Sequence, residues 1–165
     1  MRERTVVIKS LSKAYAMCGW RIGYAAGPEA IIDRMSKMQE NFNSGANAAA
    51  QYAAAYALEH RELTEQIREA FAQRRRVALE GLKNIPGMKL VEPKGAFYLF
   101  PDIRAFGLSS KEFCDRLLEE ERVVCVPGSA FGSKGEGFIR MAYTADAVKI
   151  REAMERLARF CEKRI

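Results

Sequence analysis

The chain has 165 residues, of which 48% are hydrophobic and 29% are charged, and its formal net charge is +6. This length and balance allow a buried core and exclude an intrinsically disordered chain. Four scattered cysteines without a CxxC pair, with a single histidine, argue against a disulfide framework and predict no metal site. No apolar run approaches the ~20 residues of a membrane span, and no secretory signal precedes the first expected strand. We therefore expect a soluble, cytoplasmic protein.

The positive charge raises the question of a nucleic-acid or membrane partner. The densest basic run is three arginines at residues 74–76, flanked by Glu69 and Glu80 and without interleaved aromatic residues. Such a run is typical of a solvated helix face. We expect neither nucleic acid nor membrane as a partner.

The first third of the chain predicts two strands and two helices. Residues 4–9 and 22–26 have β-branched and apolar patterns of strands. A proline then starts a helix over about 28–39, in which apolar residues recur at helical spacing. Residues 41–45 have the composition of a loop, and the alanine-rich segment 46–58 predicts a second helix.

A long helix is predicted over residues 62–84, where apolar positions keep one face for about six turns. Helices of this length often bridge two lobes of a protein. The Pro86–Gly87 pair ends the pattern. We therefore place a domain boundary near residue 61.

The remainder of the chain alternates strands and helices. Ser109 and Glu112 have the spacing of a capping box and predict a helix start, and Thr144 is the expected cap of the last helix. The buried cysteines of these two helices are expected to be Cys114 and Cys161, which fall on apolar stripes. Strands are expected at residues 88–91, 96–100, 123–126 and 138–143. The pattern predicts a small α+β sandwich.

A lysine and an arginine stand among hydroxyls and glycines directly after the first expected strand. Lys13 follows Ser10 and Ser12, and Arg21 comes eight residues later. A lysine reacts as an amine only when burial or a nearby cation lowers its pKa, whereas the arginine donor fork suits phosphate. The pattern favours a covalent amine beside a phosphate, as a phosphorylated carbonyl cofactor requires. The alternative is an ordinary surface lysine at a strand end, as at Lys9.

Five motifs follow one another along the chain: SLSKAYAMCGWRIGYAAGP (10–28), NIPG (84–87), PKGAFY (93–98), VPGSAFG (126–132) and FIRM (138–141). Together they resemble the fold type I pyridoxal-phosphate-dependent aminotransferases, class I and II, of the aspartate aminotransferase type. The resemblance implies an α/β to α+β fold. Residues 1–60 would be the C-terminal remnant of the large cofactor-binding domain. Residues 61–165 would be the small C-terminal domain with the long interdomain helix.

The same resemblance implies roles for individual residues. Lys13 would be the catalytic lysine that binds pyridoxal 5'-phosphate as a Schiff base. Ser10, Ser12 and Arg21 would hold the cofactor phosphate, and Arg140 would bind the substrate α-carboxylate. The reaction implied is the transfer of an amino group between an amino acid and a 2-oxo acid. The resemblance also implies a homodimeric enzyme that acts in amino-acid metabolism and biosynthesis.

Family elements that precede the lysine have no counterpart in this sequence, among them the aspartate that pairs with the pyridine nitrogen. We therefore expect the C-terminal portion of a longer aminotransferase, which alone binds the cofactor weakly or not at all and is inactive. Two alternatives remain open. One is a non-catalytic aminotransferase-like module for dimerisation or effector sensing. The other is a sibling pyridoxal-phosphate lyase or synthase.

Overall fold

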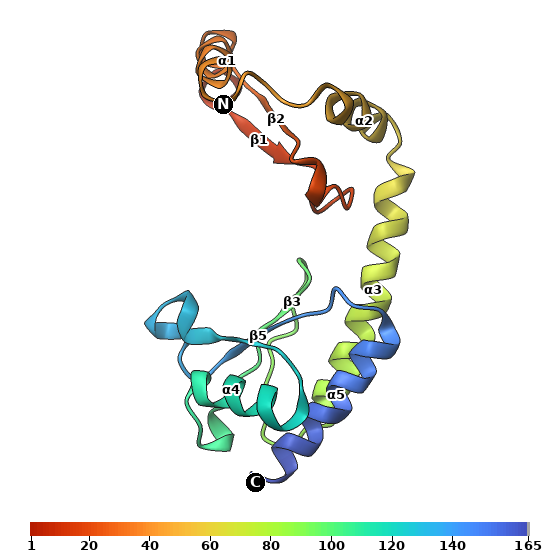
Figure 1. Ribbon diagram of the computed structural model, residues 1–165, viewed down its shortest axis with the longest axis vertical. Coiled ribbons are helices and arrows are strands. Elements are labelled where there is room, and N and C mark those ends of the chain that lie inside the picture. The colour runs from red at the N-terminus through yellow and green to blue at the C-terminus, as the bar shows by residue number, and fades with distance from the viewer. Residues whose placement is uncertain (165) are drawn as a thin grey trace. The chain divides into compact units, whose positions relative to one another are not determined.

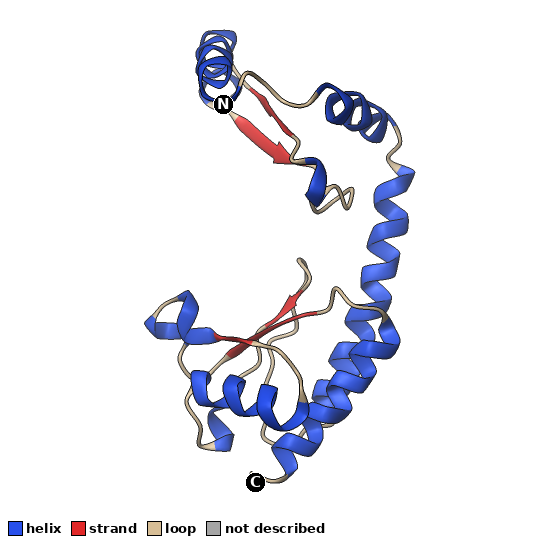
Figure 2. Ribbon diagram, in the orientation of Figure 1, coloured by secondary structure: helices blue, strands red, loops and turns tan. Residues whose placement is uncertain are grey.

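Two structural units follow one another along the chain. The computed structural model describes residues 1–164 (Figure 1). The first unit ends at Glu69, and the second begins at Ala70. Helices predominate, and the strands are short (Figure 2). The division falls within α3 (Glu62–Lys83). The bounds of α3 confirm the long helix predicted over 62–84. The second unit therefore begins inside this helix.

The first unit holds a two-stranded antiparallel sheet and two helices. β1 (Val7–Ser10) pairs with β2 (Gly23–Ala26), and α1 (Glu29–Asn43) and α2 (Ala48–Glu59) follow. Its buried residues come from the β1–β2 connection and from one stripe of α2: Leu11, Met17, Ile22, Ala50, Ala54 and Ala57. Every residue of β1 is exposed, so this sheet contributes little to the buried cluster.

Two predictions for the first unit are wrong in detail. The strand expected over 4–9 begins only at Val7, because Arg2–Arg4 forms a 3-10 helix. The loop expected over 41–45 is helical as far as Asn43. Gln39 donates to the Asn43 side chain at 2.7 Å, which supports the last turn, and Ser44 ends the helix in the left-handed conformation with φ 57°.

The second unit is built on a three-stranded antiparallel sheet. β5 (Ile139–Ala142) lies in the centre, between β3 (Tyr98–Leu99) and β4 (Val126–Pro127). Burial alternates along β5, because Ile139 and Met141 face the core whereas Arg140 is half-buried and Ala142 exposed. The sheet therefore has one covered face and one open face.

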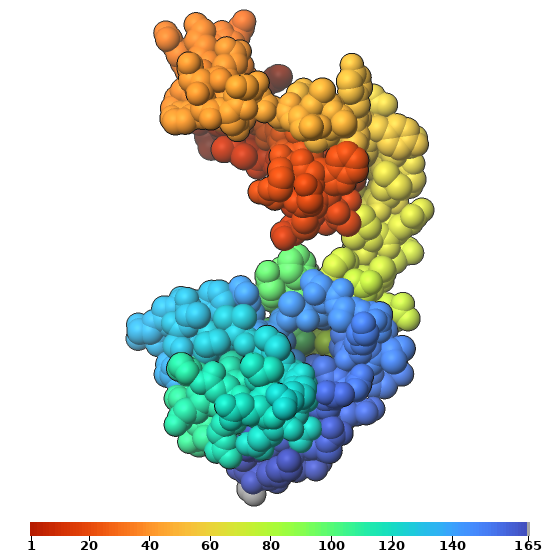
Figure 3. All heavy atoms as spheres, in the orientation of Figure 1, coloured from red at the N-terminus to blue at the C-terminus, as the bar shows by residue number. Residues whose placement is uncertain are grey.

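Three helices supply the apolar cover. α4 (Ser110–Glu121) and α5 (Ala147–Glu162) pack against each other, as Figure 3 shows, and the second half of α3 joins them. The fully buried side chains include Phe113, Leu117, Leu157 and Phe160. Cys114 and Cys161 are buried free thiols, as predicted, and burial raises their pKa values to about 11 and about 12.

The helix starts of the second unit are only partly as predicted. The capping box of Ser109 and Glu112 is confirmed. The last helix is capped by Asp146, whose carboxylate accepts from the Lys149 backbone N–H at 2.9 Å, and not by Thr144. A carboxylate is a strong N-cap acceptor, and the Thr144 carbonyl instead accepts from Arg74 at 3.1 Å.

The four strands expected in the second unit are all shorter than predicted. The strand expected over 88–91 shrinks to one bridge, in which Lys89 pairs with Asp102. Val91 is 90% exposed and the chain then bends at residues 94–97, so no ladder continues. The segment 96–100 keeps two residues of regular strand, in β3, and the segment 123–126 keeps only Val126, with which β4 begins. The 138–143 segment forms β5, the longest strand among the described residues of this unit.

Over residues 1–164, no helix has both the length and the apolar character needed to cross a bilayer. The same residues contain no group of three or more histidine, cysteine, aspartate or glutamate side chains that could hold a metal ion.

The core of the second unit predicts a large cost for truncating Leu157, which is 0% exposed. Leu157→Ala should lower the free energy of unfolding by about 2–5 kcal/mol, since it removes buried contacts and leaves a cavity. Val148→Ala on the same helix, at a side chain 72% exposed, should change it by about 0.5 kcal/mol or less. Urea denaturation followed by circular dichroism measures both, and equal midpoints for the two variants would contradict this packing.

Candidate functional site

The connection between β1 and β2, residues 11–22, forms a closed loop. Ser10 pairs with Gly23 at its base, and the Leu11 N–H donates to the Ile22 carbonyl at 3.3 Å. A Cβ at Gly23 would stand 2.6 Å from the Lys9 carbonyl oxygen, so only glycine fits this close strand pairing. The loop ends are therefore fixed by the sheet.

Apolar side chains anchor this loop on α2 and determine which of its residues face outward. Leu11, Met17 and Ile22 are buried in the cluster with the alanine stripe of α2. Lys13 lies in the turn between the first two of these anchors and is exposed. The sequence pattern therefore leaves the Lys13 amine accessible on a loop held at several points.

Four polar side chains of this loop are linked through the backbone and Cys18. The Lys13 Nζ lies 3.8 Å from the Cys18 Sγ, and that thiol donates to the Ser12 carbonyl at 3.0 Å. The Arg21 guanidinium donates to the Cys18 carbonyl at 3.0 Å. The Ser10 hydroxyl accepts from the Ser12 backbone N–H at 3.1 Å. The structure thus gathers four of the five predicted site residues in this loop and at its base, where Ser10 ends β1.

Cys18 was not predicted as a site residue, yet it contacts both the lysine and the arginine segments of this loop. The signal that separates it from Cys114 and Cys161 is its surroundings. Cys18 stands among turn residues beside Gly19, whereas the other two fall on apolar helical stripes. Its side chain is exposed, as the other two are not.

A shallow hollow of about 590 Å³ lies beside Arg21 and is bordered by the loop and the start of α2. Its lining residues are Ala16, Gly19, Trp20, Arg21, Asn47 and Ala50. Apart from Gly19 and its two chain neighbours, no atom of the described residues lies within 4 Å of the Cβ position at Gly19, so the backbone is open there. Arg21 adopts a left-handed conformation with φ 51° at the end of the 3-10 helix Cys18–Trp20.

This arrangement fits a cofactor that carries an aldehyde and a phosphate. Lys13 offers an accessible amine, the Ser10 hydroxyl keeps its own proton for donation, and one bond to the Cys18 carbonyl orients Arg21 while other guanidinium N–H groups stay available. Arg21 makes no ion pair with a carboxylate of residues 1–164. Its guanidinium could therefore bind an anion.

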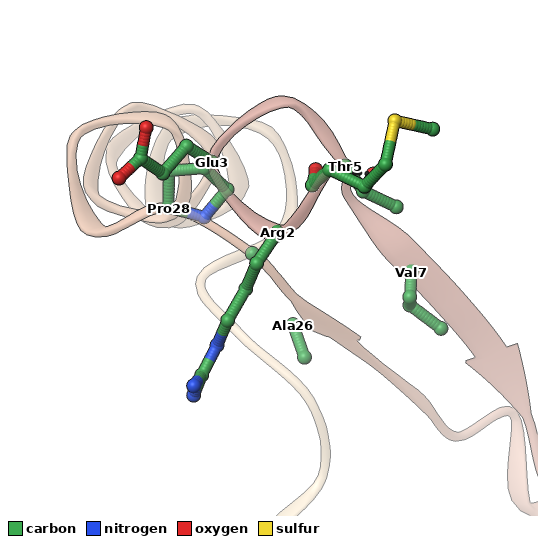
Figure 4. Close-up of a pocket in the computed structure, with 8 residues that line it drawn as sticks. Arg2, Glu3, Thr5, Val7, Ala26 and Pro28 are labelled. Carbon is green, nitrogen blue, oxygen red and sulfur yellow. Dashed lines mark hydrogen bonds between the residues drawn. The ribbon is translucent and has the colours of Figure 1, made fainter.

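A larger cavity of about 700 Å³ lies at the opposite end of the β1–β2 pair. Its lining comes from the N-terminal turn and the strand ends: Met1, Arg2, Glu3, Thr5, Val7, Ala26, Gly27 and Pro28. Figure 4 shows the Arg2 and Glu3 side chains extending in different directions, so their charges do not converge on one ligand. None of the predicted site residues lines this cavity.

The fifth predicted residue, Arg140, lies in the second unit on the open face of the sheet. Its guanidinium carbon is 4.5 Å from the centre of the Tyr98 ring and 4.4 Å from the centre of the Phe131 ring. In the described part of the chain its guanidinium forms no hydrogen bond or ion pair. Arg140 is therefore a half-buried cation without an anionic partner.

The sequence profile of the family "Aminotransferase class I and II" matches residues 1–157. The aspartate aminotransferase of Pyrococcus horikoshii is 40% identical over 163 residues, which are 97% of this chain and 42% of that protein. The solved structure of an aromatic aminotransferase from the same organism superposes with a TM-score of 0.91 at 44% identity, over 99% of this chain and 44% of that one.

A third comparison is with aspartate aminotransferase from Thermus thermophilus, solved with maleate. Its TM-score is 0.86 at 37% identity, over 96% of this chain and 42% of that one. The chain thus spans less than half the length of the relatives it matches.

Proposed function

Because this chain belongs to the aminotransferase class I and II family, we propose that it is the segment of a pyridoxal-phosphate-dependent transaminase that carries the catalytic lysine. The complete protein would move an amino group between an amino acid and a 2-oxo acid. The observation that carries this proposal is the loop 11–22, in which Lys13 is accessible while Ser10 and Arg21 are oriented by bonds within the loop.

Each residue has a distinct task in this proposal. Pyridoxal phosphate, when bound, supplies the electron sink that makes the substrate Cα proton acidic. Lys13 would hold the cofactor through its amine, and the same amine would move the substrate Cα proton as a general base and acid. Arg21 and Ser10 hold the phosphate, with Ser12 assisting, and Arg140 binds the substrate α-carboxylate.

The open face of the second unit supports the role of Arg140. The Arg140 guanidinium lies against two rings and lacks an anionic partner in residues 1–164. Its planar donor fork can donate two hydrogen bonds to the two oxygens of a carboxylate. Maleate, with which the Thermus thermophilus relative was solved, is itself a dicarboxylate.

We further propose that residues 1–60 are the C-terminal remnant of the large domain and residues 61–165 the small domain of a cytoplasmic enzyme. The exposed β1 strand supports an incomplete large domain, with Ile8 73% exposed. Alone, the chain would hold pyridoxal phosphate weakly and would not turn over.

A homodimer is the expected assembly, and the exposed Tyr52 and Tyr56 of α2 supply apolar surface for association. Sedimentation velocity over a range of protein concentrations should show a monomer that associates as concentration rises. A monomer at every concentration would contradict the dimer.

Reductive labelling tests the lysine assignment. After incubation with pyridoxal phosphate and reduction by borohydride, peptide mapping should place the label mainly on Lys13, and Lys13→Ala should remove it. The matched control is Lys9→Ala, an exposed lysine four residues earlier on β1, which should leave the Lys13 label in place. Equal labelling of Lys9 and Lys13 would contradict a retained cofactor site and favour a non-catalytic module.

A further inference from the structure

The guanidinium of Arg140 lies close to two aromatic rings that come from different elements. Tyr98 belongs to β3 and Phe131 to the 3-10 helix Gly128–Phe131 that follows β4. Both ring centres are within 4.5 Å of the guanidinium carbon, and among the described residues the two rings have no contact with each other. Both therefore act on the same cation, from separate positions.

Strand register fixes the position of Tyr98. Its direct partner on β5 is Ala142, so Arg140 is its diagonal neighbour on the same face of the sheet. The Phe97 ring lies 4.5 Å from the Tyr98 ring, centre to centre, and further limits its movement. The backbone ladder thus places this ring beside the guanidinium.

The loop that carries Phe131 is held closed by backbone N–H groups and by a close approach of two glycines. The Gly128 N–H donates to the Phe138 carbonyl at 2.8 Å, and the Gly137 N–H donates to the buried Ser110 hydroxyl at 2.8 Å. A Cβ at Gly128 would stand 2.2 Å from the Gly135 oxygen, so the two sides of the loop approach as closely as glycine permits.

A second ring supports Phe131 from outside this loop. Phe100 meets Phe131 edge to face at 6.1 Å and stacks on Phe138 at 5.5 Å with an interplanar angle of 11°. Phe131 is 51% exposed yet is held by these contacts. Its position follows from its aromatic neighbours and from the closed loop.

We propose that Tyr98 and Phe131 are positioning residues that hold the plane of the Arg140 guanidinium, so that its edge and not its faces meets the substrate carboxylate. The proposal rests on the role of Arg140 given above. Cation–π contact attracts an aromatic face to the guanidinium face, and this leaves the in-plane N–H groups for two parallel hydrogen bonds to a carboxylate. Neither ring needs to touch the carboxylate itself.

Arginine side-chain NMR of the 165-residue chain tests this device without cofactor or turnover. The variants Tyr98→Leu and Phe131→Leu remove a ring and keep an apolar side chain, whereas Tyr98→Phe and Phe131→Tyr keep the ring. Rotation of the Arg140 guanidinium about its Nε–Cζ bond should be about threefold faster in each leucine variant, since each loses one cation–π contact. The ring-keeping variants should match the unmodified chain.

Acetate, added at constant ionic strength, supplies the second readout through the Arg140 Nε–H signal. Its dissociation constant should rise about threefold in each leucine variant and stay unchanged in the ring-keeping variants. The amide signals of Ile139 and Met141, on the covered face, report that the sheet is intact in every variant.

The outcomes separate the two proposals. If acetate fails to move the Arg140 signal in the unmodified chain, the carboxylate role of Arg140 fails, while the rotation rates still decide whether the rings hold the guanidinium. Equal rotation in the leucine variants and the unmodified chain overturns the positioning role. Faster rotation with unchanged acetate affinity overturns it as well, because the rings would then not assist binding.

Discussion

Packing of one face of β5 against the helices is the constraint on which the second unit depends. Ile139 and Met141 are buried with α4, α5 and the end of α3, and the two-residue period of a strand then forces Arg140 onto the opposite face. A register shift of one residue would bury the cation and expose two apolar side chains. The hydrophobic core and the position of Arg140 are therefore set by the same pattern.

The first unit achieves its arrangement with far less buried surface. Three side chains of the loop 11–22 rest on three alanines of α2, and these six residues are its buried cluster among residues 1–164. Alanine permits close approach but contributes little area, so the unit gains little free energy from this cluster. Besides these apolar anchors, the position of Lys13 depends on strand pairing at the loop base and on hydrogen bonds through Ser12 and Cys18.

Features with a local physical cause were predictable from the sequence. The capping box at Ser109 and the helix over 62–84 follow from spacing alone, and the motif around Lys13 identified the family. Features that depend on contacts between particular side chains were not. The helical turn at residues 41–43 depends on an amide contact, and the thiol of Cys18 approaches Lys13 only because the loop closes. The rings beside Arg140 meet it through register and loop closure, which no periodicity encodes.

The central claim is that the strand that carries Arg140 is built on an extensive buried core, whereas the loop that carries Lys13 rests on a small one. Native-state hydrogen exchange, followed residue by residue at concentrations where the chain is monomeric, tests this most directly. The account predicts that amides of β5 and α5 exchange together at the slowest rates and that amides of β1 and β2 exchange much faster. Protection of β1 and β2 equal to that of β5 would contradict it.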